Sequence, residues 1–142
     1  MDKDKQPGIR FDNIMLVKES FWRDFIVQAD SRVVFDIKHN WNSNGDRYLS
    51  ELLTSLSLIY DEKEVLKLES TFVGLFSVIG NCENMDIVDY IKNYSPALML
   101  PYIREHISSI TQKAGIKPVL LPPINIVALI NKTEPEEKES SD

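Results

Sequence analysis

The chain has 142 residues, 43% hydrophobic and 27% charged, which is enough for one globular domain and too few for two comfortable ones. Its formal net charge of −6 argues against nonspecific binding to nucleic acid or to an anionic membrane surface. No run of about 18 consecutive apolar residues occurs, so the sequence predicts no membrane insertion.

The cysteine content and the first residues indicate the compartment. Cys82 is the only cysteine, so no intrachain disulfide can form, and a reducing cytoplasm fits. Residues 1–10 lack a long apolar run after their charges, so we expect no signal peptide. We therefore expect a cytoplasmic protein.

The first half of the chain has the pattern of β-strands. Residues 9–21 are apolar-rich, and their alternation slips near Asn13 and Ile14, which indicates a bulge. Residues 32–41 alternate well, and the turn signal of Asn44 and Gly45 predicts a hairpin to the next strand. Residues 48–60 and 65–78 alternate in the same way, and Gly74 falls on the inward row of the last strand, where it marks a bulge or a close backbone approach.

After residue 80 the period of the apolar residues becomes helical. Asn84 is a candidate N-cap for a helix that Ser95 and Pro96 then break. Pro101 suits the first turn of a second helix, which ends at Gly115. One side of that helix is apolar and needs a cover, with Tyr102, Ile103, His106, Ile107 and Ile110 on it. Residues 124–130 predict a short final helix.

These elements predict an α+β fold, a four-stranded antiparallel sheet with two main helices packed on one side. The first two strands are joined through residues 22–31, which we interpret as a crossover or loop. We expect residues 1–8 to be a flexible lead, residues 9–131 to be the domain and residues 132–142 to be a disordered acidic tail.

The sequence carries little that points to catalysis. Neither a GxxxxGK[ST] nor a GxGxxG motif occurs, which argues against an ATP-driven machine. His39 and His106 fall on apolar rows, where a histidine is more often a hydrogen-bonded core or interface residue than a ligand or catalyst. Cys82 has no second cysteine nearby to share a metal, and a Cys82–His106 nucleophile pair, the enzyme alternative, has no obvious third group to orient it. We expect no enzyme activity, no cofactor and no bound metal.

Aromatic residues gather near the predicted crossover. Phe21, Trp22 and Phe25 have the charged Arg23 and Asp24 between them, which favours partial exposure and partner binding. Phe35 and Trp41, by contrast, fit a core as well as a binding surface.

Three segments of the chain carry recognisable family motifs. They are residues 74–80 (GLFSVIG), residues 95–115 (SPALMLPYIREHISSITQKAG) and residues 120–129 (LLPPINIVAL). In this order, and after four predicted strands, they resemble the end of the fourth strand, the long helix, and the proline loop with the second helix of the SecB family of protein-export chaperones.

The resemblance implies a homotetramer built as a dimer of dimers, with the long helices at the interface through Tyr102, Ile103, His106, Ile107 and Ile110. It also implies an apolar groove for unfolded chains and an acidic contact with the motor protein SecA on the exposed sheet face. The implied groove residues are Phe21, Trp22, Phe25, Val33, Phe35, Ile37, Ile124, Ile126 and Leu129. The implied motor-contact residues are Glu19, Asp24 and Glu69.

The chain also departs from the family pattern. Arg23 crowds one acidic position and Lys67 replaces an apolar surface residue, which weakens the expected SecA contact. Residues 19–23 (ESFWR) resemble the SecB-like branch that protects antitoxins.

The resemblance therefore implies an ATP-independent holdase that binds unfolded preproteins and keeps them competent for export. The alternative is a SecB-like chaperone dedicated to one client, such as an antitoxin of a toxin–antitoxin system. The sequence leaves the client open.

Overall fold

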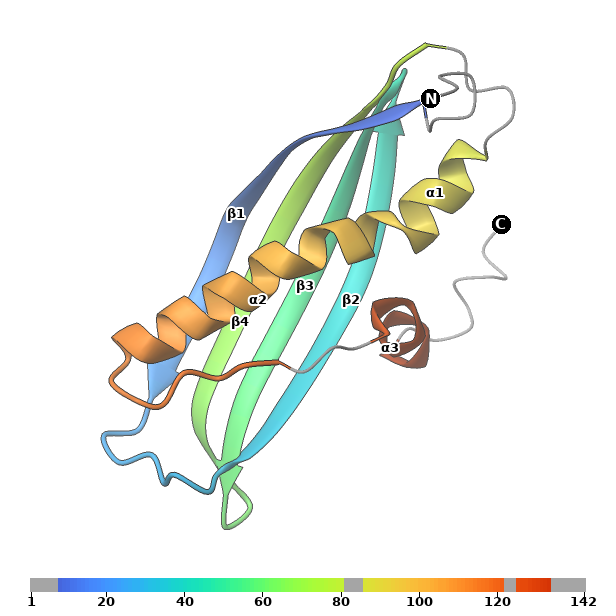
Figure 1. The fold of residues 1–142 in the computed structure, drawn as a ribbon. Coiled ribbons are helices and arrows are strands. Elements are labelled where there is room, and N and C mark those ends of the chain that lie inside the picture. Colours follow the sequence, from blue (N-terminus) through green and yellow to red (C-terminus); the bar gives the residue numbers. More distant parts are fainter. Residues whose placement is uncertain (1–7, 81–85, 122–124, 134–142) are drawn as a thin grey trace.

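The computed structural model of the chain describes residues 8–80, 86–121 and 125–133. Strands β1 (Ile9–Arg23), β2 (Arg32–Asn44), β3 (Arg47–Tyr60) and β4 (Lys63–Val78) form one antiparallel sheet. Helices α1 (Ile87–Asn93) and α2 (Ser95–Lys113) meet at Tyr94 and run across one face of that sheet, while α3 (Ile126–Thr133) lies beside β2 (Figure 1). The α+β prediction is confirmed.

The strands are ordered β1-β4-β3-β2, so the segment between β1 and β2 joins the two edges of the sheet. This confirms the predicted crossover, although Trp22 and Arg23 still belong to β1 and only residues 24–31 make the connection. We call residues 24–31 the crossover loop. The β2–β3 turn contains Gly45, with a φ of 67°, as its sequence predicts.

The core lies between α2 and the face of the sheet that α2 covers. Ile37 of β2, Leu52 of β3 and Phe76 of β4 are buried there, and Met99 and Ile103 of α2 pack against them. The inward rows predicted from the alternation of β2, β3 and β4 are the rows that face α2.

Gly74 of β4 lies where α2 approaches the sheet. A Cβ atom at this position would stand 2.9 Å from Met99 Sδ and 3.1 Å from Phe76 Cε1. The close-approach interpretation of this glycine is confirmed, and because both neighbours are buried, any larger residue would force the Met99 and Phe76 side chains to shift.

A chain of buried polar groups joins the sheet to the start of α2. His39 Nε2 and Ser50 Oγ lie 2.7 Å apart, Ser50 Oγ and Ser95 Oγ lie 2.7 Å apart, and Ser95 Oγ donates to the Ile91 carbonyl. His39 is therefore a core histidine held by hydrogen bonds, as its apolar surroundings predict. Burial lowers the pKa of His39 from 6.5 to about 4, so the ring is neutral near pH 7.

The helix boundaries differ from those predicted. The long helix begins at Ser95, with Pro96 in its first turn, and Pro101 lies inside it. Pro101 and Ala97, whose carbonyl loses its usual partner, are both exposed, so water can reach that carbonyl and the helix continues. Asp86 caps α1 by accepting a hydrogen bond from Asp89 N, whereas the predicted cap, Asn84, lies outside the described residues.

The final helix runs from Ile126 to Thr133 and so includes the first two residues of the predicted tail. The rest of that tail, residues 134–142, lies outside the described residues, as do residues 1–7 of the predicted lead.

Strand β1 contains the predicted bulge, between Phe11 and Asn13, and also a second register shift between Leu16 and Lys18. Each shift moves the following side chains to the other face of the sheet. As a result Glu19 pairs with Ser70 on the face that α2 covers.

The neutral, buried His39 makes stability depend on pH. Because the unfolded chain binds this proton near pH 6.5 and the folded chain only near pH 4, the free energy of unfolding should fall as the pH falls through that window. The slope should approach about 1.4 kcal/mol per pH unit. Urea unfolding of the wild type and of a His39→Gln variant from pH 7 to pH 4 measures the difference. Parallel curves for the two proteins would contradict the assignment.

Candidate functional site

A groove of about 680 Å³ lies between the crossover loop and the segment that follows α2. The crossover loop forms one wall, residues 115–121 form the other, and Val33 and Leu58 come from the sheet. The side chains from the two walls are mostly apolar, namely Phe25, Ile26, Val27, Ala29, Ile116, Pro118, Val119, Leu120 and Leu121.

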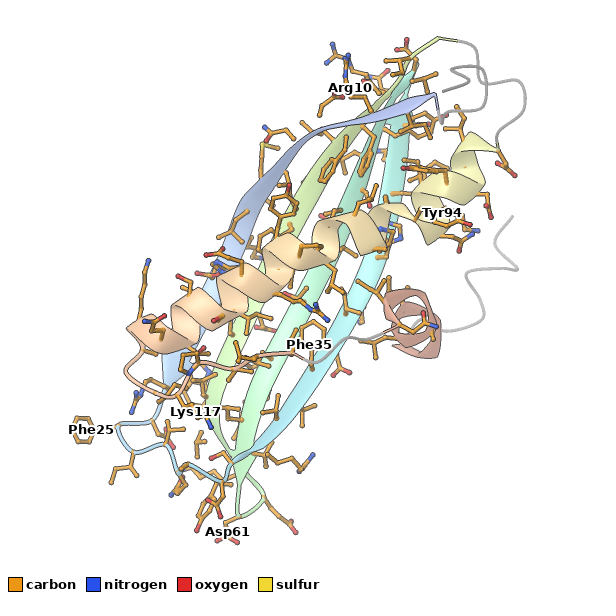
Figure 2. All side chains as sticks on the ribbon, in the orientation of Figure 1. Arg10, Phe25, Phe35, Asp61, Tyr94 and Lys117 are labelled. Atoms are coloured by element: carbon orange, nitrogen blue, oxygen red, sulfur yellow. The ribbon has the colours of Figure 1, made fainter. Side chains whose placement is uncertain are left out.

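Several of these apolar side chains have no cover. Phe25 is 95% exposed, Leu120 75% and Ile26 67%. Figure 2 shows Phe25 pointing away from the body of the molecule at the tip of the crossover loop. Burying one such side chain fully against another molecule would contribute about 1.5–3 kcal/mol, so the groove is suited to binding an apolar partner.

Arg23 holds the two walls together. Its Nε donates to the Asp24 carbonyl at 2.9 Å and its Nη2 to the Phe25 carbonyl at 2.7 Å, both in the crossover loop. Its Nη1 donates to the carbonyl of Ala114, the C-cap residue of α2. A cation is favourable at the negative end of a helix, so Arg23 both caps α2 and fixes the crossover loop beside it.

The second wall is anchored through Thr111 of α2. Its hydroxyl donates to the Ile107 carbonyl at 2.8 Å and accepts from Val119 N at 2.9 Å. Gly115, with a φ of 81°, turns the chain at the end of α2 so that it can run back along the sheet. The groove is therefore formed before any partner arrives.

The predicted client-binding residues lie in different parts of the structure, and only some of them line the groove. Phe25 and Val33 line the groove, whereas Ile37 and Ile126 are buried in the core. Phe35 and Leu129 are half-buried and pack against the core, and Ile124 lies outside the described residues. Phe21 and Trp22 are partly exposed at the end of β1, where Phe21 pairs with Leu68 on the α2 side and Trp22 pairs with Lys67 on the other face.

The sequence prediction missed the wall formed by residues 115–121. These residues have neither a helical nor a strand period, and Pro118 interrupts them. The useful signal is the run Val119, Leu120 and Leu121 directly after that proline, because apolar residues in a constrained loop have no periodic core face to enter.

The predicted interface stripe on α2 is also divided. Ile103 and Ile107 are buried against the sheet of the same protomer, and Ile110 is half-buried. Tyr102 is 49% exposed and faces outward beside Phe11, with an edge contact at a ring separation of 6.0 Å. His106 bonds to Glu19 and makes an edge contact with Phe72.

The predicted acidic residues do not share a face. Glu69 is exposed on the sheet face away from α2, which we call the open face, whereas Glu19 lies on the covered side and bonds to both His106 and Ser70. The placement of Glu19 on the exposed face is therefore wrong, and the second register shift in β1 is the reason. Asp24 lies in the crossover loop and pairs with Lys63 at 3.4 Å.

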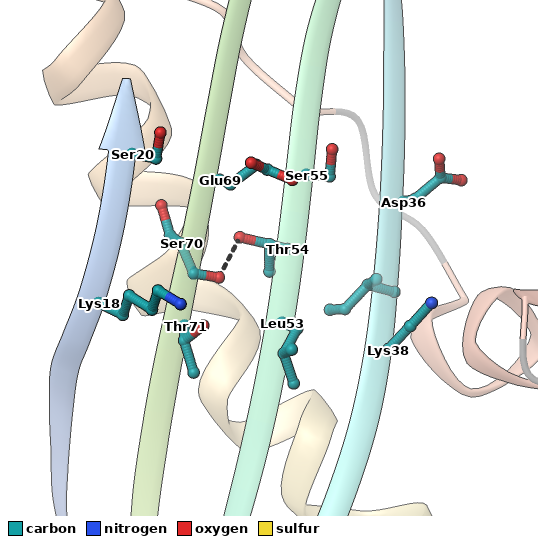
Figure 3. A pocket seen from close by; sticks show the side chains of 11 residues that line it. Lys18, Ser20, Asp36, Lys38, Leu53, Thr54, Ser55, Glu69, Ser70 and Thr71 are labelled. Atoms are coloured by element: carbon teal, nitrogen blue, oxygen red, sulfur yellow. Dashed lines mark hydrogen bonds between the residues drawn. The ribbon is translucent and has the colours of Figure 1, made fainter. Parts of the chain in front are cut away.

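The open face has a hollow of about 370 Å³ that is lined mostly by polar and charged residues (Figure 3). Lys18, Asp36, Lys38 and Glu69 lie around Leu53 there, so the hollow presents charges of both signs. It is smaller than the groove, and Leu53 is the exposed large apolar side chain in its lining.

Residues with metal-binding side chains do not cluster in the described part of the chain. Cys82, the residue of the enzyme alternative, lies outside the described residues. Among the helices that the structure describes, none is long and apolar enough to cross a membrane.

The sheet, the long helix on one face and the uncovered apolar groove together define an α+β protein with a surface suited to an apolar partner. The family model described as "Preprotein translocase subunit SecB" matches residues 19–137. The chain belongs to the SecB family of chaperones.

Two curated relatives align with most of this chain. The protein-export protein SecB of Chromobacterium violaceum is 28% identical over 117 residues, which cover 82% of this chain and 77% of that one. An uncharacterized protein of Methanocaldococcus jannaschii, MJ0357, is 24% identical over 155 aligned positions, which cover 100% of this chain and 95% of that one.

Among solved structures, the SecB-like chaperone Rv1957 of Mycobacterium tuberculosis, in complex with a ChAD peptide from the HigA1 antitoxin, has a similar fold. The TM-score is 0.73 at 13% identity, over 82% of this chain and 91% of that one. The fold prediction therefore agrees with a solved member of the group.

The role of Arg23 in holding the crossover loop beside the end of α2 can be tested by hydrogen–deuterium exchange. An Arg23→Met change removes all three hydrogen bonds, and a hydrogen bond from a charged group contributes about 1.5–3 kcal/mol. We expect faster amide exchange in residues 24–31 and 113–121, with exchange in the centre of β3 unchanged. An Arg23→Lys variant keeps the charge but cannot reach three carbonyls, and should restore only part of the protection. If amide exchange in residues 24–31 and 113–121 is the same in the Arg23→Met variant as in the wild type, Arg23 does not hold the two segments together.

Proposed function

We propose that this chain is an ATP-independent holdase that captures unfolded polypeptides in the groove beside the crossover loop. The observation that carries the proposal is the uncovered apolar surface of Phe25, Ile26 and Leu120, held open by Arg23. A folded client hides its apolar side chains, whereas an unfolded chain exposes many. Burial without directional contacts discriminates poorly between sequences, so the groove suits many clients.

We expect tight binding of a client to need several grooves that act together. A single apolar segment in one groove binds weakly, because much of the gain from burial is offset by the ordering of the client. When several grooves belong to one assembly, the second and later contacts are intramolecular and the affinity rises steeply. Family membership favours such an assembly, and we propose a homotetramer arranged as a dimer of dimers.

The surface available to that assembly lies along β1 and the outer side of α2. Tyr102 is exposed on α2, and Met15, Leu16 and Val17 are exposed on the edge strand β1. Ile103 and Ile107 contribute indirectly, since they fix α2 on the sheet and so orient Tyr102. The native mass in light scattering distinguishes a tetramer from a single protomer.

We propose that the clients are preproteins kept competent for export, as the names of many relatives suggest. Transfer to SecA would then use the open face, where Glu69 is exposed, with Asp24 at its margin and Lys67 close by. Glu19 does not belong to this contact, because it is bonded to His106 on the other side of the sheet.

A second candidate function is protection of a single client, such as an antitoxin. The solved neighbour with an antitoxin peptide favours this alternative. A pull-down under native conditions separates the two, since a mixed set of preproteins supports the export role and one small antitoxin supports the dedicated role.

The groove assignment can be tested with a permanently unfolded probe, reduced and carboxymethylated lactalbumin. Replacing Phe25 and Ile26 by alanine should weaken binding at least about ten-fold, because each side chain loses about 1.5–3 kcal/mol of possible burial. Isothermal titration calorimetry measures the affinity. The thermal midpoint should hold, since both side chains are exposed in the free protein.

A Leu53→Ala variant is the matched control, because Leu53 is an exposed apolar residue on the open face. It should leave the affinity for the probe unchanged. Equal affinity of the wild type and the groove variant, or a larger loss in Leu53→Ala, would rule out the groove as the binding site.

A further inference from the structure

The rim of the groove has a charge opposite to that of the chain as a whole. The full sequence carries 22 acidic and 16 basic side chains, for a net charge of −6. The side chains that line the groove nevertheless include two cations, Arg23 and Lys117, and no carboxylate. Asp24 and Asp30 belong to the crossover loop but do not line the groove, so the two charged side chains that do line it are both positive.

The two cations differ in what they are free to do. The guanidinium of Arg23 is occupied by the carbonyls of Asp24, Phe25 and Ala114. Lys117 is exposed in the second wall, and within the described residues it forms no ion pair. Its ammonium is therefore available to a bound molecule.

A second hollow, of about 520 Å³, lies beside the groove and shares Phe25, Ile26 and Gln28 with it. Its charged lining differs, because Asp24 and Asp61 face it and Lys63 is already paired to Asp24. A carboxylate on a client would be repelled there, whereas beside Lys117 it would be attracted. The wall that carries Lys117 is therefore the positive side of the groove.

We propose that the groove prefers apolar segments of unfolded chains that carry an acidic side chain next to the apolar residues, and that Lys117 is the residue that selects them. The inference rests on the proposed function, since it concerns the same groove. Apolar burial gives the affinity, and the ion pair between Lys117 and a client carboxylate adds a preference among segments of equal hydrophobicity. Such a pair is exposed, so its effect is small and is screened by salt.

Three fluorescent peptides test the proposal, all with one apolar core and flanked by glutamates, glutamines or lysines. Anisotropy titrations at low and at physiological salt measure the dissociation constants for the wild type and for Lys117→Gln. We expect Lys117→Gln to weaken binding of the glutamate peptide roughly two- to five-fold and to leave the glutamine peptide unchanged. The effect should shrink at the higher salt concentration.

A Lys38→Gln variant controls for net charge. It changes the charge of the protein by the same amount, but Lys38 lies on the open face, away from the groove. If Lys38→Gln weakens the glutamate peptide as much as Lys117→Gln does, or if neither does, the selection by Lys117 is overturned. If the glutamine peptide fails to bind the wild type, the proposed function fails instead, so the two ideas are tested separately.

Discussion

The contact of α2 with one face of the sheet is the constraint on which the rest of the structure depends. It requires Gly74, because a side chain there would meet Met99 and Phe76. The polar chain of His39, Ser50 and Ser95 fixes where the helix starts, and the apolar side chains of Ile103 and Ile107 keep it against β3 and β4. Once α2 is seated in this way, its length and direction decide which apolar surfaces are covered.

The end of α2 determines the groove. The helix ends at Lys113, next to the crossover loop, and the chain then turns at Gly115 and runs back along the sheet. The crossover loop and residues 115–121 thus lie side by side without a helix over them, which leaves Phe25 and Leu120 exposed (Figure 1). Arg23 fixes the crossover loop relative to the end of α2, because its guanidinium donates hydrogen bonds to carbonyls on both sides, those of Phe25 and Ala114. A groove that is formed in advance costs a client less than one that must first assemble.

The parts of the fold that follow from local periodicity could be predicted from the sequence. Strands β2, β3 and β4 alternate regularly, and the Asn44–Gly45 pair marks their hairpin, so the inward rows and the sheet were predictable. The start of α2 could not be predicted, because Pro96 and Pro101 can each occupy the first turn of a helix. The structure shows that the helix begins before Pro96 and that Pro101, which is exposed, lies inside it.

The site was less predictable for a similar reason. No glycine or proline marks the second register shift in β1, so the sequence does not reveal it. This shift places Glu19 on the covered face of the sheet instead of the open face. Ile37 and Ile126 are apolar, as residues of a client-binding surface would be, but both are buried in the core. The sequence alone does not show whether an apolar side chain is covered by its own protomer or left for a partner. The exposure of Phe25 could be predicted, because Phe25 stands next to charged residues in a segment without a strand or helix period and so has no core face to enter.

A footprint of a bound unfolded protein tests the central claim most directly. Hydrogen–deuterium exchange of the chain, with and without saturating carboxymethylated lactalbumin, reports which amides the client protects. The account predicts new protection in residues 25–33 and 115–121 and none around Lys38, Leu53 and Thr71 on the open face. Protection confined to the open face, with the groove segments unchanged, would contradict it.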